Sequence, residues 1–460
     1  MERMSTLDAG FYLVDHENVP MHLGSVAVFD GPAPHLSELA GLYTARLPRV
    51  PRCLQVVRPR PLQLRRPVWA DAADFDIWDH LRYAAVPPPG DEAQLREVAS
   101  RIYAQPLDMR KPLWEAWLLD GLADGRWAVL SKVHHCVIDG IGGSDLLTVI
   151  FGDNSSKADP SLPDRQPGVA ESLAETAAWP LRQIAAATCS LLTQLPAVPD
   201  LLSYGMGLAR GARRLAATSV RSLNGPAGQG RKWAWTSISL DDVRQIRAEL
   251  GGTVNDVLLT AVAGGFRTLM PEAELTGDAV VRSLVPVSIR TATESGSMTN
   301  RLSAVLVNLP VAEPDPLRRL QRVRAQTDDL KRTHQAAGPE LIMALLEPVA
   351  PPLLALALRA AFRLPQPLVQ TVTTNVPGPR DQLSALGRPL VAIYPYAPIG
   401  GNVRISVAIY SYSGSLYFGI TADNDAVAEP AELTQGIDRE LAVLIRLARG
   451  NQDRMQMAAA

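Results

Sequence analysis

The stretch that decides the fold is His134-His135-Cys136-Val137-Ile138-Asp139-Gly140, which follows an alternating run from Trp127 to Val133. The alternation predicts a buried strand, so that the HHxxxDG heptad lies where the strand ends and turns. Imidazole takes and returns a proton near neutral pH, and α/β enzymes carry their chemistry at strand ends. A carboxylate and a glycine downstream can fix the loop that holds such a base. The stretch therefore predicts an active-site loop.

Other interpretations of the two histidines have to be weighed. A metal site is disfavoured, because neighbours at a strand end point in opposite directions and no further ligand stands nearby at a familiar zinc spacing. A serine hydrolase would carry GxSxG, a pattern that the sequence lacks. A purely structural turn at Asp139-Gly140, with His134 as a satisfied core histidine, stays open.

Composition bounds the class of protein. The chain has 460 residues, of which 47% are hydrophobic, and this length predicts two domains of about 200 residues each. A net charge of -2 disfavours nucleic-acid binding, which usually requires a basic face. The cysteines Cys53, Cys136 and Cys189 show no CxxC spacing, so neither a disulfide framework nor a zinc site is indicated. The N-terminus lacks the apolar core of a signal peptide, and we expect a cytoplasmic protein.

Two stretches, residues 177–208 and 341–362, are very apolar but are interrupted by prolines and charged side chains. Neither reaches the 18 uninterrupted apolar residues, or about that number, expected of a membrane span. Each stretch predicts either buried helix or an apolar surface that meets lipid. The second alternative would place the protein on the inner membrane face or on lipid droplets.

Helical and strand-like runs alternate along the chain. Helices are predicted at 36–47, 92–104, 240–250, 257–269 and from an N-cap at Ser144 onward, and strands at 23–29, 127–133, 236–240, 279–287, 302–309, 369–374, 403–412 and 415–422. The pattern predicts an α/β protein in three parts. Residues 1–152 form a first domain with the heptad, residues 153–232 a loop and helical connector, and residues 233–460 a second domain.

Further short elements stand in order around the heptad. They are Pro20-Met21-His22-Leu23-Gly24, Pro67-Val68-Trp69, Pro106-Leu107-Asp108, Pro112-Leu113-Trp114-Glu115, Val254-Asn255-Asp256-Val257, Val285-Pro286-Val287-Ser288-Ile289-Arg290, Thr374-Asn375-Val376-Pro377-Gly378-Pro379 and Ser411-Tyr412. With these elements the sequence resembles, over nearly its whole length, the bacterial wax ester synthase/diacylglycerol acyltransferase family. That family is part of the CoA-dependent acyltransferase superfamily, together with chloramphenicol acetyltransferase and the condensation domains of peptide synthetases.

The resemblance implies a fold and an activity. The fold would be two chloramphenicol-acetyltransferase-like α/β domains, with the active site in a tunnel at their interface. Acyl-CoA would enter from one side and the alcohol from the other. The reaction would move a long-chain acyl group from acyl-CoA to diacylglycerol or a fatty alcohol, making triacylglycerol or wax ester. No metal or redox cofactor is implied, and the acyl-CoA is a substrate.

Within the heptad, the resemblance assigns His135 as the general base and His134 as its neighbour in the catalytic loop. The base would remove the proton of the alcohol, whose oxygen would attack the thioester directly. Asp139 is implied to hold the loop by pairing with a distant arginine, and Arg290 is our candidate partner. Gly140 would supply a backbone conformation that a side chain obstructs.

Three further pairs or triplets are candidate substrate-binding residues. Pro112-Leu113-Trp114 would shape the acyl channel, although these side chains are equally suited to a core. Asn255-Asp256 opens an apolar helix and has a helix cap as its alternative role. Thr374-Asn375 lies where the superfamily carries a strand that lines the site, and is a candidate source of oxyanion donors.

Two rival functions stay open at this level. A condensation-type enzyme that uses another thioester donor or acceptor shares HHxxxDG. The Pro-Leu-Trp and Asn-Val-Pro-Gly-Pro elements, and the lack of an attached carrier domain, disfavour it. A non-catalytic lipid-binding scaffold is the second rival. Such proteins tend to lose the base, whereas this chain keeps both histidines.

Overall fold

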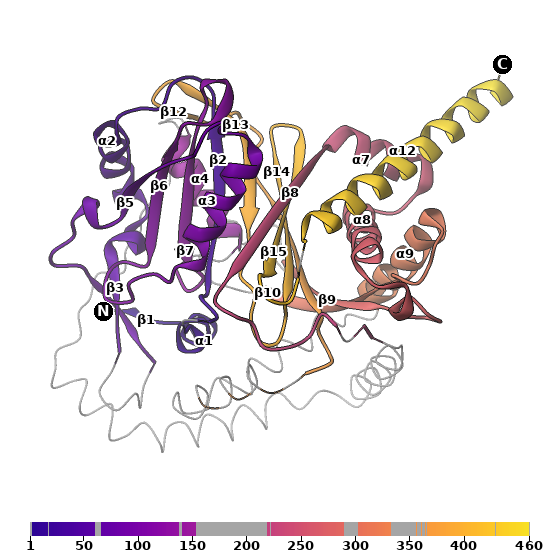
Figure 1. Ribbon diagram of the computed structural model, residues 1–460, viewed down its shortest axis with the longest axis horizontal. Helices are drawn as coiled ribbons and strands as arrows, with labels where there is room; N and C mark the ends of the chain where they lie inside the picture. Colours follow the sequence, from indigo (N-terminus) through magenta and orange to yellow (C-terminus); the bar gives the residue numbers. More distant parts are fainter. Residues whose placement is uncertain are drawn as a thin grey trace.

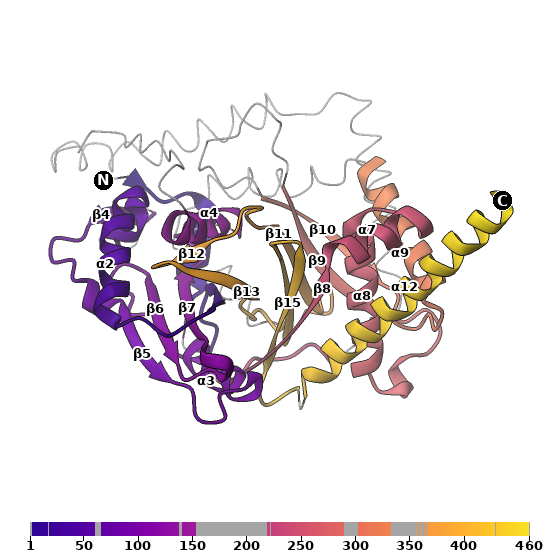
Figure 2. The same ribbon diagram turned by 90° about the horizontal axis from the view of Figure 1, so that it is seen from above.

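Two six-stranded sheets organise the part of the chain that the computed structural model describes (Figures 1 and 2). The described residues are 2–16, 18–59, 66–137, 140–152, 219–220, 222–288, 302–332, 356, 360, 364, 366–427 and 429–459. Buried apolar side chains of both sheets and of the helices that pack on them form the core, as expected for a mixed α/β protein. Within these ranges, no helix is both long and apolar enough to cross a bilayer.

The first sheet has the strand order β12-β13-β2-β7-β6-β5. In that order the strands span Ser384–Ala385, Arg388–Tyr396, His22–Phe29, Trp127–His134, Trp114–Asp120 and Leu81–Ala85. Neighbours pair antiparallel except β5 and β6, which are parallel. A small sheet of order β1-β4-β3 (Glu2–Arg3, Val68–Asp71 and Gln55–Arg58) is formed by the N-terminal half of the chain.

The second sheet has the order β10-β9-β11-β14-β15-β8. In that order the strands span Leu302–Leu309, Val281–Ser288, Thr371–Pro377, Ile405–Tyr412, Ser415–Asp423 and Arg231–Ser239. Strand β11 runs parallel to both of its neighbours, and the remaining pairs are antiparallel. Strands β14 and β15 of this sheet are almost continuously buried, which explains why they are rich in apolar residues.

Helices pack on both sheets. Helices α2, α3 and α4 (Leu36–Arg46, Glu92–Ala104 and Gly140–Phe151) pack on the first sheet, with α3 on the face opposite α2. Helices α7, α8, α9 and α12 (Leu240–Leu250, Val254–Leu269, Pro316–Arg332 and Ala431–Ala459) gather on the side of the second sheet that faces away from the first (Figure 2). The long C-terminal helix α12 extends beyond the body of the molecule (Figure 1).

The chain crosses between the sheets in its second half. After β11 it leaves the second sheet, forms β12 and β13 in the first sheet, and returns as β14. The two sheets come into close contact at Gly419 of β15, where a Cβ atom would lie 1.7 Å from the carbonyl oxygen of Pro395 in β13. Glycine is therefore required at this point of contact.

Lys132 is fully buried in β7, and the groups around its ammonium compensate for the loss of water. Its Nζ donates to the carbonyl oxygens of Ile102 (3.2 Å) and Gln105 (2.6 Å) at the C-terminal end of α3, and lies 3.7 Å from Glu115 Oε2. A cation at this end of a helix complements the helix dipole and its last carbonyls. Burial lowers the pKa of Lys132 to about 8, against the opposing effect of Glu115.

Most predicted elements are confirmed, although several begin or end a few residues from the predicted bounds; β8, for example, spans Arg231–Ser239, where the sequence predicts a strand at 236–240. The helix over 240–250 and the strand over 302–309 have the predicted bounds. Helix α4 begins at Gly140, so Ser144 is not its N-cap. Helix α8 begins at Val254, which places Asn255 and Asp256 in its first turn. The division at residues 152 and 232 stays a prediction, since 153–218 lie outside the described residues.

We predict that Gly419→Ala destabilises the protein, because the new methyl group would force β15 away from Pro395. Overpacking of this kind costs about 1–3 kcal/mol, and more where backbone must shift. Gly41→Ala in α2 is the matched control, since nothing lies within 4 Å of its Cβ position and alanine favours a helix. Thermal unfolding followed by circular dichroism should show a lower Tm for Gly419→Ala and no loss for Gly41→Ala. Equal Tm values for the two variants would contradict the close contact.

The buried thiol of Cys53 makes stability depend on alkaline pH. Burial raises its pKa from an ordinary value near 9 to about 12. Between these values the unfolded chain loses the thiol proton while the folded chain keeps it, so the contribution is complete below pH 9 and is lost toward pH 12. One pH unit in this window corresponds to about 1.4 kcal/mol. We predict that Cys53→Ala loses less Tm than the unmodified chain between pH 8 and pH 10. The same loss in both proteins would show that Cys53 does not contribute.

Candidate active site

The heptad begins at the end of β7. His134 is the last residue of the strand, residues 135–137 form a turn, and α4 starts at Gly140. The His134 amide donates to Leu113 O (2.9 Å) and the His135 amide to Met21 O (2.8 Å), so the strand end is held on both sides. The two imidazoles then diverge: His134 is 1% exposed, and His135 is partly exposed and lines a cavity.

His134 braces the turn. Its Nδ1 accepts a hydrogen bond from the Cys136 amide (3.1 Å), so in the neutral ring the proton is on Nε2. That Nε2 lies 3.3 Å from Asp15 Oδ2, within ion-pair distance, although it is not aligned as a hydrogen bond. Tyr12 meets the same ring edge-on, with centroids 6.4 Å apart. Nδ1 of His134 thus holds the turn itself, and Nε2 faces the N-terminal segment.

His135 lies in a cavity of about 440 Å³ between the two sheets. This volume falls in the range of about 300–1,000 Å³ that is usual for small-molecule sites. The walls come from α1 (Thr6–Val14), α4, β2, β7, β9, β10, β11, β14 and the crossing segment at 393–400, and they are mostly apolar. Among the described residues, the polar side chains on the walls besides His135 are Ser25, Ser131, Thr374, Tyr396 and Tyr410.

Strand β11 brings Thr374 to the cavity and turns Asn375 away from it. Side chains alternate along a strand, and Val372, Thr374 and Val376 line the cavity. Thr373 points to the opposite face, where its hydroxyl bonds the Ser283 hydroxyl at 2.8 Å. Asn375 follows the same alternation and is exposed. The two candidate oxyanion donors are therefore separated, and of the two only Thr374 faces the cavity at His135.

Pro112, Leu113 and Trp114 form part of the core behind β7 and do not line the cavity. The Trp114 ring stacks on Tyr43 and His80, with centroids 5.7 and 4.6 Å away. The carbonyl of Leu113 accepts the His134 amide. The structure thus places this element behind the strand that carries the heptad, which is the core role that the sequence left open beside that of a channel wall.

Asn255 and Asp256 lie in the first turn of α8, and neither lines the cavity. Asp256 forms a capping box with Thr253, because each residue's side chain accepts from the other's amide. Its Oδ1 also accepts from the Thr327 hydroxyl of α9 (2.7 Å). These bonds match the alternative role of the pair as a helix cap.

The remaining heptad residues are described in part. Asp139 and Arg290 lie outside the described residues, so their pairing stays a prediction. Gly140 is described as the first residue of α4. Burial raises the pKa of the Cys136 thiol well above its usual range, and Asp8 and Asp15 add to this. The thiol stays protonated at neutral pH, which makes it a poor nucleophile.

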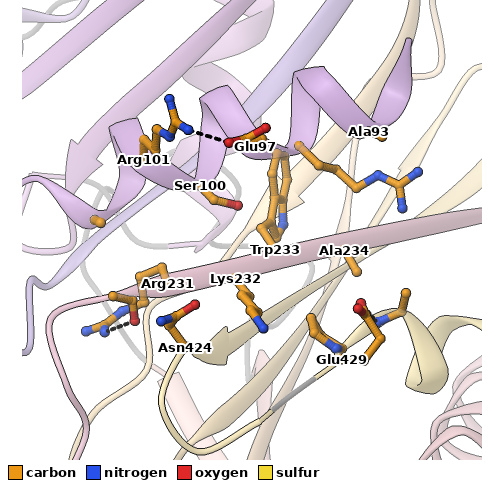
Figure 3. A pocket seen from close by; sticks show the side chains of 15 residues that line it. Ala93, Glu97, Ser100, Arg101, Arg231, Lys232, Trp233, Ala234, Asn424 and Glu429 are labelled. Atoms are coloured by element: carbon orange, nitrogen blue, oxygen red, sulfur yellow. Dashed lines mark hydrogen bonds and ion pairs between the residues drawn. The ribbon is translucent and has the colours of Figure 1, made fainter.

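A second cavity, of about 520 Å³, lies between α3 and β8 (Figure 3). Its arginines are already engaged. Arg96 pairs with Glu92 (3.5 Å) and Arg101 with Glu97, while Arg231 donates to three backbone carbonyls. No histidine is among the described residues that line it. The cavity at His135 therefore remains the candidate active site.

Several cavity residues could not be found from the sequence. Phe11, Tyr396 and Tyr410 belong to segments that are far from the heptad and carry no spacing that connects them with it. Tyr410 directly precedes the Ser411-Tyr412 element, which is the nearest available signal. Only the crossing of β13 and the packing of α1 bring these side chains to His135.

Comparison with known proteins gives matches over nearly the whole chain. The wax ester synthase/diacylglycerol acyltransferase catalytic domain matches residues 4–258, and the WS/DGAT C-terminal domain matches residues 298–444. A protein of Mycobacterium tuberculosis (strain H37Rv), described as a probable diacylglycerol O-acyltransferase, is 35% identical over 456 residues, which cover 98% of this chain and 97% of the relative.

Solved structures agree with the fold. The wax ester synthase/diacylglycerol acyltransferase from Marinobacter aquaeolei VT8 superposes with a TM-score of 0.70 at 22% identity, covering 97% of this chain and all of the other. The first condensation domain of the CDA synthetase gives 0.61 at 15% identity, covering 97% and 96%. The predicted α/β fold with two sheet-rich domains is confirmed. The chain belongs to the wax ester synthase/diacylglycerol acyltransferase family and is an acyltransferase.

Proposed function

We propose that this protein transfers a long-chain acyl group from acyl-CoA to diacylglycerol or a fatty alcohol, with His135 as general base. The observation that carries the proposal is the partly exposed His135 imidazole on the wall of an apolar cavity between the two sheets. A mostly hydrocarbon wall suits an acyl chain, and His135 lines the same cavity, so the base would be within the space that the acyl-CoA enters. The relative described as a diacylglycerol O-acyltransferase supports diacylglycerol as one acceptor.

The proposed reaction needs one base and no covalent enzyme intermediate. An alcohol has a pKa close to that of water, about 16, and attacks poorly until its proton is removed. His135 would take that proton as the alcohol oxygen forms a bond to the thioester carbonyl carbon. The carbon–sulfur bond then breaks, and the imidazolium returns the proton to the CoA sulfur. The buried, protonated Cys136 has no part in these steps.

The oxyanion of the tetrahedral intermediate requires hydrogen-bond donors on the cavity wall. We assign Thr374 to this role, since its side chain lies on the cavity face of β11. The hydroxyls of Ser25 and Ser131 also line the cavity, on strands of the first sheet, and lie 3.2 Å from each other, so each already has a partner. They are better suited to hold β2 and β7 in register than to donate a hydrogen bond to the oxyanion as it forms.

We also propose that the protein touches a lipid surface peripherally. The stretch 177–208 lies outside the described residues, and 341–362 is described at two positions only. Leu356 in the second stretch, and Leu364 and Leu368 just after it, are exposed by 67%, 62% and 49%. Exposed leucines this close together in sequence are typical of surfaces that bind membranes or partners. Both proposed acceptors partition into membranes, so we propose that lipid, and not another protein, contacts these leucines.

We predict that His135→Ala lowers kcat by about 10²- to 10⁴-fold, the usual contribution of general acid-base catalysis. The assay is transfer of labelled palmitoyl groups from palmitoyl-CoA to diacylglycerol and, separately, to hexadecanol. Cys136→Ala is the matched control, since it changes the adjacent buried side chain and should keep kcat within about threefold. Full turnover by a folded His135→Ala protein would refute the assignment of the base.

We predict that replacing Leu356, Leu364 and Leu368 together by Ser lowers binding to vesicles of phosphatidylcholine and phosphatidylglycerol at least tenfold. Burying one leucine is worth about 1.5–3 kcal/mol, and a tenfold change in binding corresponds to about 1.4 kcal/mol. Even partial burial of three leucines in the bilayer therefore contributes more than a tenfold change in binding. Co-sedimentation with the vesicles measures the change. Leu386 and Leu447, exposed by 37% each, are replaced by Ser as the control and should leave binding unchanged. Undiminished binding of the triple variant contradicts the lipid contact.

A further inference from the structure

The N-terminal helix α1 reaches both histidines of the heptad. It lies beside the end of β7 (Figure 1), and Phe11 on this helix stacks on the His135 imidazole. The ring centroids are 3.9 Å apart and the ring planes meet at 22°. Tyr12 and Asp15 contact His134 in the same region. One short segment, which is far from the heptad in sequence, therefore surrounds the catalytic loop.

Two hydrogen bonds that share Met21 connect this segment with His135. Asp15 Oδ2 accepts from the Met21 amide (2.7 Å), and the Met21 carbonyl accepts from the His135 amide (2.8 Å). The same Asp15 oxygen lies 3.3 Å from His134 Nε2. The position of the His135 backbone relative to α1 is thus set by an unbroken series of contacts.

Helix α1 is itself well anchored. The Ser5 hydroxyl caps it by accepting from the Asp8 amide (3.0 Å), and the Met4 amide donates to Pro67 O (3.0 Å). On its inner side Ala9, Leu13 and Val14 are buried. Phe11 packs between the main core of the first sheet and a small cluster around Val14. A ring held in this way keeps one orientation and can impose it on a neighbour.

We propose that Phe11 is a positioning residue for His135: its flat contact fixes the plane of the imidazole and leaves the ring edge turned to the cavity. The nitrogens of an imidazole lie in its edge, so a partner on its face restricts rotation without covering them. Phe11 and His135 both line the cavity, so the contact is made at the reacting site itself. This proposal rests on the general-base role of His135.

Two variants at position 11 separate the effect of a flat ring from that of apolar volume alone. Leucine keeps an apolar side chain at position 11 but gives the imidazole no flat partner, whereas tyrosine keeps the ring. A base displaced by about 1 Å loses rate by up to about 10²-fold. We therefore expect Phe11→Leu to lower kcat about 10- to 100-fold, with less than a threefold change in KM for palmitoyl-CoA. Phe11→Tyr, which keeps the ring, should keep kcat within about threefold of the unmodified protein.

Ser5→Ala is the matched control, because it removes the cap of the same helix and touches neither ring. It should lower Tm and keep kcat within about twofold, which separates loosening of α1 from loss of the ring contact. The variants are compared in the full-length protein, with Tm measured for each. Equal kcat values for Phe11→Leu and Phe11→Tyr would overturn the proposal, as would a change confined to KM or to acyl-length preference.

A double-variant cycle keeps this proposal distinct from the proposed function. If Phe11 acts through His135, adding Phe11→Leu to His135→Ala lowers kcat no further. A further tenfold loss in the double variant would show that Phe11 acts independently and would overturn the proposal. If His135→Ala alone keeps full turnover, the general-base assignment fails, and the positioning role fails with it. If His135→Ala is inactive while Phe11→Leu is fully active, only the positioning role is wrong.

Discussion

The crossing of β13 into the first sheet is the constraint on which the rest of the structure depends. Strand β13 pairs with β2, with Pro395 opposite Ser25 and Tyr396 opposite Gly24. Without it, β2 would be an edge strand with unpaired backbone groups, which a folded protein avoids. The segment that follows, up to residue 400, forms part of the cavity wall. Pairing of β2 and closure of the cavity are therefore consequences of the same crossing.

Buried polar side chains around this cavity are matched to backbone groups. His22 Nε2 lies 2.9 Å from the Tyr103 carbonyl, and burial, with a further effect from Lys132, lowers the pKa of His22 well below its usual range. A neutral His22 can donate its Nε2 proton to that carbonyl. Lys132 and His134 are used in comparable ways, at the end of α3 and in the turn after β7. Of the histidines in the described ranges, His135 is the one on the cavity wall.

Local patterns predicted the elements well because they depend on neighbours in sequence. Periodicity located the helix at 240–250, and alternation located β7. Ser144 failed as an N-cap because such a preference is worth only about 1 kcal/mol, and tertiary packing overrides it. Alternation along β11 implies that Thr374 and Asn375, as neighbours in one strand, cannot face the same cavity.

The sequence by itself determined the elements, the place of the heptad at a strand end, and, through its resemblance, the family and the histidine expected to act as base. The tertiary structure alone decided which side chains surround His135. Phe11, Tyr396 and Tyr410 come from α1, β13 and β14, and the Pro112-Leu113-Trp114 element became a support behind the strand. The physical reason is that periodicity and capping are local, whereas the contacts that build the cavity join distant segments through packing and strand pairing, which no local pattern records.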